Sequence, residues 1–173
     1  MRPRGEVRQA IGRAVEQFDA DIVCLQEVRK VNRQEAEYFT RWPQIPQADF
    51  LAPEGYEAVY RTNAVTRHGE HGNALLSRWP VLDHQHEDMS DHRFEQRGML
   101  HAEMQVQGRS LHVIVVHLGL IRASRVRQLA QGAGGSGQPP WLVAVHDRSE
   151  AQRELDEREL LLSPAQRIAP VHR

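Results

Sequence analysis

Three features that define large classes of protein are missing or nearly missing from this 173-residue chain. It has one cysteine, Cys24, which excludes an intramolecular disulfide framework and fits a reducing compartment. No apolar run approaches membrane-spanning length, and the first residues lack the apolar segment of a signal peptide. The formal net charge is only −1, so electrostatics gives no reason to expect tight binding to nucleic acid. We therefore expect a cytoplasmic protein without a transmembrane segment.

The chain does contain enough apolar residues, 40% of the total, to form one globular core. An amphipathic pattern predicts a helix over residues 6–18, and the apolar run at 22–25 predicts a buried strand directly after it. Residues 62–72 read as a polar loop, and residues 83–95 as a polar, histidine-rich segment. The remaining pattern predicts helices over 32–39, 124–131 (with Ser124 as N-cap) and 149–162, and strands over 56–60, 73–77, 98–106, 110–117 and 141–145. This order of elements is typical of an α/β fold.

Two polar side chains stand at the ends of apolar runs. Glu27 follows the run at 22–25, and His117 follows the run at 111–116. Taken alone, each is more often structural. A carboxylate suits Mg²⁺, which also binds substrate phosphate, and an imidazole can donate a hydrogen bond to phosphate or transfer a proton. If the two strand ends are neighbours, the carboxylate can bind the metal while the imidazole assists hydrolysis by hydrogen bonding or proton transfer.

Four segments resemble, in order and at natural loop spacing, the motifs of the endonuclease/exonuclease/phosphatase superfamily. They are DADIVCLQEV (19–28), HGNALLSRWPV (71–81), EQRGMLHAEMQVQG (95–108) and LHVIVVHLGLIRASRVRQL (111–129). The resemblance implies a four-layer α/β (α+β) sandwich and a hydrolase of phosphoester bonds that depends on Mg²⁺ or Mn²⁺. It also implies a nucleic acid, a phospholipid headgroup or a small phosphate ester as the substrate.

The same resemblance assigns residues. Glu27 matches the magnesium-binding glutamate of the family, and His117 matches its active-site histidine. Asn73 and Arg97 lie in motif strands and are candidates for lining the site, although strand-end hydrogen bonding or a surface ion pair explains them equally well. Asp147 stands nearest to the place of the family's Gly-Asp-x-Asn motif, with His146 beside it as a weaker surrogate.

The match is incomplete at both ends. Members of the superfamily begin with a strand that ends in a metal-binding asparagine, and they finish with a Ser-Asp-His motif. The Ser90-Asp91-His92 string has these letters, but it precedes the expected hairpin, so we interpret it as a coincidence in a loop. The missing first strand predicts self-association through the unpaired sheet edge beside residues 22–25.

The composition changes abruptly after Leu129, to glycine, serine and proline and then to arginine, glutamate and leucine. An altered reading frame or an incomplete gene is our hypothesis for this change. We therefore assign residues 6–131 to a partial endonuclease/exonuclease/phosphatase-like domain. Residues 132–140 then form a flexible linker, and residues 141–173 form an atypical C-terminal segment.

Two other functions stay open at this point. The string His84-Gln85-His86-Glu87-Asp88 echoes the zinc motif of metallo-β-lactamase-like hydrolases, although position 89 is methionine where that motif continues with histidine. A chain without part of its catalytic residues can also be a non-catalytic remnant or a binding module. Zinc content tests the first alternative, and Mg²⁺-dependent hydrolysis tests the second.

Overall fold

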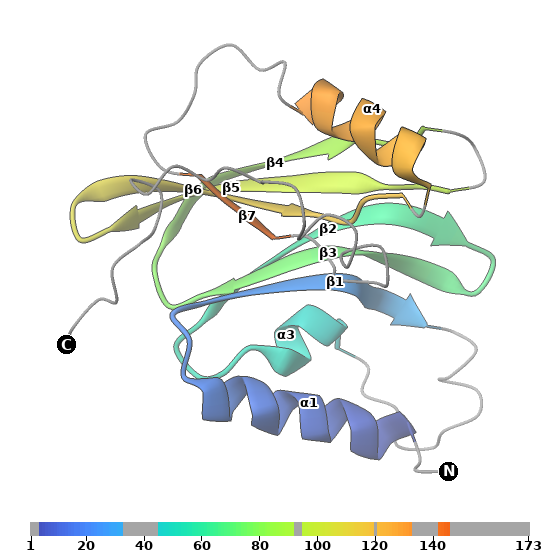
Figure 1. Ribbon diagram of the computed structural model, residues 1–173. Helices are drawn as coiled ribbons and strands as arrows, with labels where there is room; N and C mark the ends of the chain where they lie inside the picture. The colour runs from blue at the N-terminus through green and yellow to red at the C-terminus, as the bar shows by residue number, and fades with distance from the viewer. Residues whose placement is uncertain (1–3, 33–44, 92–94, 120, 133–141, 146–173) are drawn as a thin grey trace.

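Two β-sheets face each other, and helices cover both outer faces (Figure 1). The computed structural model describes residues 4–32, 45–91, 95–119, 121–132 and 142–145. Their elements are α1 (Arg4–Phe18), β1 (Ile22–Asn32), α3 (Gln47–Leu51), β2 (Glu57–Thr66), β3 (Gly69–Ser77), β4 (Val81–Asp88), β5 (Gly98–Val106), β6 (Arg109–Val116), α4 (Arg122–Gly132) and β7 (Leu142–Val145). The predicted four-layer α/β sandwich is confirmed.

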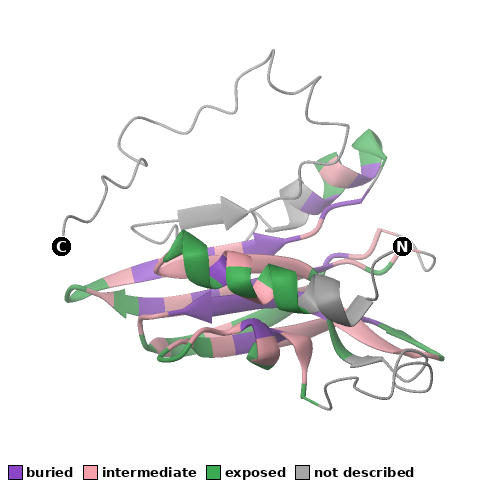
Figure 2. Cartoon of the chain, turned by 90° about the horizontal axis from the view of Figure 1, so that it is seen from below, coloured by how far each residue is buried: buried purple, intermediate pink, exposed green. Residues whose placement is uncertain are grey.

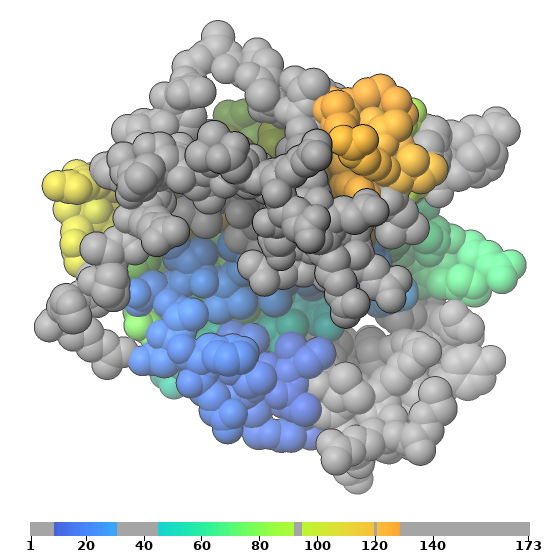
Figure 3. All heavy atoms as spheres, in the orientation of Figure 1, coloured from blue at the N-terminus to red at the C-terminus, as the bar shows by residue number. Residues whose placement is uncertain are grey.

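The first sheet has the antiparallel order β1-β3-β2, and α1 and α3 lie on its outer face. The second sheet has the order β4-β5-β6-β7, in which β7 pairs in parallel with β6 and the other neighbours are antiparallel. α4 lies over its outer face. Figure 3 shows the atoms of α1 (blue) and α4 (orange) on opposite sides of the strands. The strand predicted at 141–145 is therefore present, whereas the division of the chain at residue 132 stays a prediction.

The core is formed by strand side chains that point alternately to the two faces of each sheet. On β3, Leu75 faces the second sheet, where it joins Leu100 and Val113, while Leu76 faces the helices and joins Val15 of α1. In Figure 2 the buried residues follow the strands, and exposed residues line the outer face of α1. The predicted apolar face of α1 is only partly used, because Phe18 at its end is 79% exposed.

Polar strands account for most errors in the predicted elements. The loop predicted at 62–72 is wrong, because β2 and β3 continue through it as a hairpin. Its polar side chains pair across the sheet, where Thr62 Oγ1 donates to Glu70 Oε2 at 2.9 Å. β4 was missed for the same reason, since it is a half-exposed edge strand of polar residues.

Three further predictions meet the limits of the described residues. The helix predicted at 32–39 lies almost wholly outside them, and Asn32 itself ends β1. The helix predicted at 149–162 also lies outside them. Ser124 is not an N-cap, because α4 begins at Arg122 and the Ser124 hydroxyl donates to Asp91.

The edge of the first sheet is relevant to assembly. Within the described part of the chain, β1 has one strand neighbour, β3. Self-association through the other edge of β1 stays a prediction. Among the described residues, none of the helices has the length and apolar content needed to span a membrane.

Candidate functional site

A β-bulge in β1 places the first candidate residue, Glu27. Leu25 pairs with Ala74 and Val28 pairs with Gly72, so the two residues between them stand opposite Asn73 alone. Glu27 has φ = 56°, in the left-handed region that residues other than glycine seldom adopt. Bulges reorient side chains and recur next to functional sites. The predicted position of Glu27 after a strand end is therefore wrong, since β1 continues through it to Asn32.

The bulge is fixed to the second sheet by Gln26. Its Nε2 donates to the carbonyl oxygen of Val116 at 2.6 Å, across the gap between the sheets. Val116 is the last residue of β6, and His117 follows it directly. This contact therefore brings the Glu27 bulge to the end of β6.

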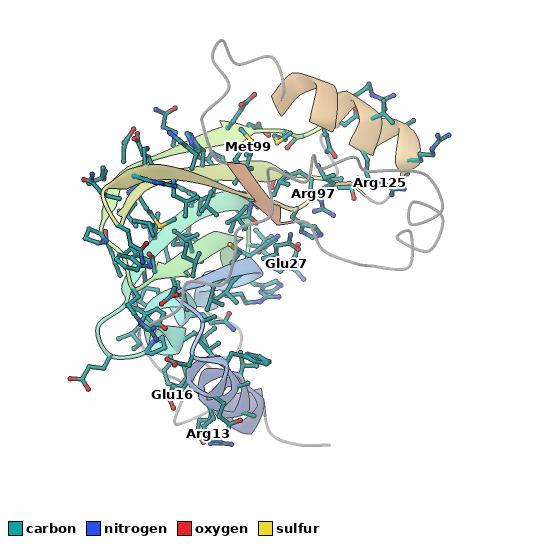
Figure 4. All side chains as sticks on the ribbon, turned by 60° about the vertical axis from the view of Figure 1, so that its left-hand side comes forward. Arg13, Glu16, Glu27, Arg97, Met99 and Arg125 are labelled. Carbon is teal, nitrogen blue, oxygen red and sulfur yellow. The ribbon has the colours of Figure 1, made fainter. Side chains whose placement is uncertain are left out.

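Three basic side chains surround the Glu27 carboxylate, and all three contact the same oxygen, Oε1. His117 Nδ1 lies 3.0 Å from it, His71 Nε2 lies 3.9 Å from it, and Arg97 Nη1 lies 4.0 Å from it. Figure 4 shows Glu27 and Arg97 at the same end of the sandwich. The hydrogen bond from His117 lowers the pKa of Glu27 to about 2, and the charges of His71, His117 and Arg97 act in the same direction against burial. The carboxylate is therefore ionised at any physiological pH.

Arg97 is the most strongly held of these groups. Its side chain is 13% exposed, and Nη2 donates to Glu95 Oε1 at 2.9 Å. Nε donates to the carbonyl oxygen of Leu118, one residue after His117, at 3.3 Å. These contacts fix the guanidinium beside Glu27, so a planar cation with several donors faces the same space as the two imidazoles.

Asn73 lies beneath this group, between the sheets. It is fully buried, and its Nδ2 donates to the carbonyl oxygens of Gly98 (2.8 Å) and Val115 (3.0 Å). Its Oδ1 is buried without a hydrogen-bond partner. The amide thus joins β5, which begins directly after Arg97, to β6, which ends directly before His117. A direct role for Asn73 in lining the site stays a prediction. Asp147 and His146 lie outside the described residues.

His71, Gln26 and Glu95 belong to the site but were not among the sequence candidates. The signal for His71 was available, because an antiparallel β3 would place it opposite Arg29, beside the bulge. The prediction of a loop at 62–72 hid it. Neither Gln26 nor Glu95 carries a sequence signal, since their roles depend on contacts with Val116 and Arg97.

The chemistry of the donors decides which metal the site can take. In the described parts of the chain, there is no group of three or more histidine, cysteine, aspartate or glutamate side chains that could hold a metal ion. Glu27 offers one hard oxygen ligand, with its side chain 54% exposed. Mg²⁺ fits this arrangement, because it keeps several waters and binds through one or two carboxylates together with substrate phosphate.

The alternative zinc site at 84–88 is not assembled as a cluster of donors among the described residues. His84 Nδ1 accepts a hydrogen bond from Arg61 at 2.7 Å, and His86 Nε2 lies 3.3 Å from Asn63 Oδ1. Each histidine thus has one ring nitrogen in contact with a neighbouring side chain that is not a usual zinc ligand. The nearby Asp91 likewise has a structural contact, because it accepts hydrogen bonds from Ser124 and Arg127 of α4.

A sequence model described as the endonuclease/exonuclease/phosphatase family matches residues 3–170. The chain belongs to this family. Over 120 residues, this family member is 40% identical to YbhP from Escherichia coli, an overlap that covers 68% of the chain and 47% of YbhP. The chain thus spans about half the length of the curated relatives it matches.

Solved structures agree on the fold. A family protein from Leptotrichia buccalis has a TM-score of 0.60 at 11% identity, covering 85% of this chain and 61% of that one. A mannosyl-6-phosphatase from Bacteroides thetaiotaomicron has a TM-score of 0.58 at 16% identity, with 83% and 56% covered. At these identities the comparison shows a shared architecture and nothing of the substrate.

Proposed function

We propose that this family member hydrolyses phosphoester bonds in a reaction that depends on Mg²⁺ or Mn²⁺. The observation that carries the proposal is the asymmetric environment of Glu27. His117, Arg97 and His71 each approach the carboxylate most closely at Oε1, and for none of them is Oε2 the nearer oxygen. We assign Oε2 to the metal. Bound there, Mg²⁺ would neutralise charge that develops on the phosphoryl oxygens.

The chain's own residues supply the other requirements. Arg97 presents guanidinium donors beside the carboxylate, in a geometry suited to phosphate oxygens. His117 Nδ1 faces Glu27, so the other ring nitrogen, Nε2, is the one that can donate a hydrogen bond to the phosphate or transfer a proton when the ring is in its imidazolium form. His71 adds a second imidazole on the same side. Phosphate binding is thus assigned to Arg97 and His71, and proton donation to His117.

The substrate class is a phosphoester of a nucleic acid, a phospholipid headgroup or a small molecule. The near-neutral net charge argues against a dedicated DNA enzyme, because such enzymes gain much of their affinity from basic surfaces. Selectivity within the class depends on loops around the site.

Hydrolysis of p-nitrophenyl phosphate and bis(p-nitrophenyl) phosphate, with Mg²⁺ or with EDTA, tests the proposal. We expect Glu27→Gln and His117→Ala each to lose at least about 100-fold in kcat/KM, the equivalent of a few kcal/mol of transition-state stabilisation. Glu103→Gln makes the same chemical change on the outer face of the second sheet and should leave the rate unchanged. Equal rates in wild type and Glu27→Gln would overturn the assignment.

One observation favours a second candidate, a phosphate-binding module without turnover. The described residues supply one carboxylate ligand but three cationic or imidazole groups. Saturable binding of inorganic phosphate that Arg97→Ala abolishes, with no hydrolysis of either nitrophenyl ester, would select this candidate.

A further inference from the structure

Gln128, on α4, is a buried polar residue that the proposed chemistry does not use. Its side chain is 1% exposed, although glutamine is mostly a surface residue. The amide oxygen accepts from the backbone N–H of Gly119 at 2.8 Å, and Nε2 donates to the carbonyl oxygen of Met89 at 2.9 Å. Both ends of the amide are therefore satisfied by backbone groups of two different loops.

These two bonds belong to a closed ring. The Met89 N–H donates to the carbonyl oxygen of Arg97 at 2.9 Å, and Arg97 Nε donates to the carbonyl oxygen of Leu118 at 3.3 Å. The peptide that joins Leu118 to Gly119 closes the circuit back to Gln128. We call this set of five residues the Gln128 ring. Its bonds all run in the same sense, and the Gln128 amide and the Leu118–Gly119 peptide each accept one bond and donate the next, so these bonds polarise and strengthen one another.

The ring includes one residue of the proposed site, Arg97, and adjoins another, His117. Arg97 is a member, and His117 directly precedes Leu118, in a segment beyond the last pair of β6, where none of the described strands pairs with it. Within the described residues, the Gly119 N–H is held by Gln128 and the Gly119 carbonyl oxygen accepts from Arg125 at 3.4 Å. One helix therefore holds both backbone polar groups of Gly119, two residues after His117.

Packing leaves little freedom for this loop to move. A Cβ added at Gly119 would lie 3.0 Å from Glu95 Oε2 and 3.2 Å from Ser124 Cβ, so the absence of a side chain permits the close approach of α4. α4 is itself anchored at its first turn, because Ser124 and Arg127 donate to the Asp91 carboxylate. The helix is thus a fixed support against which the loop is held.

We infer that Gln128 is a positioning residue, which holds Arg97 and the His117 loop in the geometry that binds phosphate and delivers a proton. The inference rests on the proposed function of the Glu27 site. Removing the amide leaves the Gly119 N–H and the Met89 carbonyl buried without partners. These groups then shift to find water, and the shift moves both Arg97 and His117.

Gln128→Leu tests the inference, because it replaces the amide by an apolar side chain of similar size. Residues that orient catalytic groups typically cost 10- to 100-fold in activity when replaced, so we expect kcat/KM for bis(p-nitrophenyl) phosphate with Mg²⁺ to fall by about that factor. The control is Ser77→Ala, which removes another nearly fully buried hydrogen-bonding side chain, at the other end of β3. It should leave kcat and KM within about twofold of wild type at matched temperatures below both unfolding transitions.

Amide hydrogen exchange separates this inference from the proposed function, because it needs no turnover. In wild type the Gly119 and Met89 amides should be protected, and Gln128→Leu should lose that protection together with most of its affinity for inorganic phosphate. If wild type hydrolyses neither ester, the proposed function fails while exchange and phosphate binding still decide the role of Gln128. An unprotected Gly119 amide in wild type overturns the inference, and so do unchanged kcat, KM and phosphate affinity in Gln128→Leu.

Discussion

Replacing Asn73 tests whether one side chain joins the two sheets beneath the site. Its Nδ2 donates to two buried carbonyl oxygens, those of Gly98 and Val115. Each bond contributes about 1 kcal/mol net, and a buried carbonyl left without a partner costs about 1–3 kcal/mol. Asn73→Ala also removes Oδ1, a buried oxygen without a hydrogen-bond partner, and this offsets part of the lost free energy of unfolding. We therefore expect Asn73→Ala to lower the free energy of unfolding by about 2–4 kcal/mol.

A second substitution separates hydrogen bonding from side-chain volume. Asn73→Asp keeps the shape but replaces the donor by an acceptor that faces the same two carbonyl oxygens, and it buries a charge. It should therefore destabilise the fold more than Asn73→Ala at pH 7. Urea unfolding measures both, with an unchanged m-value expected. Ser77→Ala, on the same face of β3, is the control at about 1 kcal/mol. The reasoning is refuted if Asn73→Ala costs no more than this control, or if Asn73→Asp is milder than Asn73→Ala.

Three further predictions concern Glu27, Arg97 and Cys24. The pKa of Glu27 in the folded protein, about 2, lies below its usual value of 4.5, so its ionisation stabilises the fold above pH 4.5 and this contribution is lost as the pH falls toward 2. Glu27→Gln should remove that pH dependence in urea unfolding, by less than about 1 kcal/mol because the carboxylate is half exposed. Arg97→Ala should raise KM for phosphoesters at least about tenfold, the value of one charged hydrogen bond, while Lys30→Ala at an exposed ion pair should not. Burial raises the pKa of the Cys24 thiol to about 12, so thiol reagents at pH 8 should react more than about a hundredfold faster in urea than in the folded protein.

The sequence predicted the parts of the fold that bury apolar side chains in regular alternation. β5 and β6 were located closely, because Leu100, Ala102 and Met104 alternate with polar residues and all three are fully buried. β4 and the outer half of the β2–β3 hairpin were not. Their strands are held by backbone pairing with polar neighbours, and such pairing leaves no apolar signal in the sequence.

For the candidate site, too, one part could be predicted from the sequence and another could not. Glu27 and His117 follow apolar runs, and the structure brings their side chains within 3.0 Å. The bulge at Glu27 could not be predicted, because it depends on register: two residues of β1 oppose Asn73, and Gln26 reaches Val116 from a distance of 90 residues along the chain. A one-residue difference in register changes which face a side chain occupies. The apolar runs in the sequence therefore identified Glu27 and His117, but not the contacts that orient their side chains.

The bulge gives the two oxygens of the Glu27 carboxylate different surroundings, and this difference bears on how ligands would bind. Oε1 faces His117, Arg97 and His71, whereas we assign Oε2 to the metal. The positive charge of Arg97 beside Oε1 weakens the attraction of Glu27 for a divalent cation and strengthens the attraction of the site for phosphate. Metal and phosphate would then each supply the charge that the other needs, so we expect them to bind with positive coupling, equal in both directions. Because Glu27 stays ionised down to about pH 2, protons do not compete for either oxygen at physiological pH, and the balance of charge around the carboxylate, rather than its titration, would control binding.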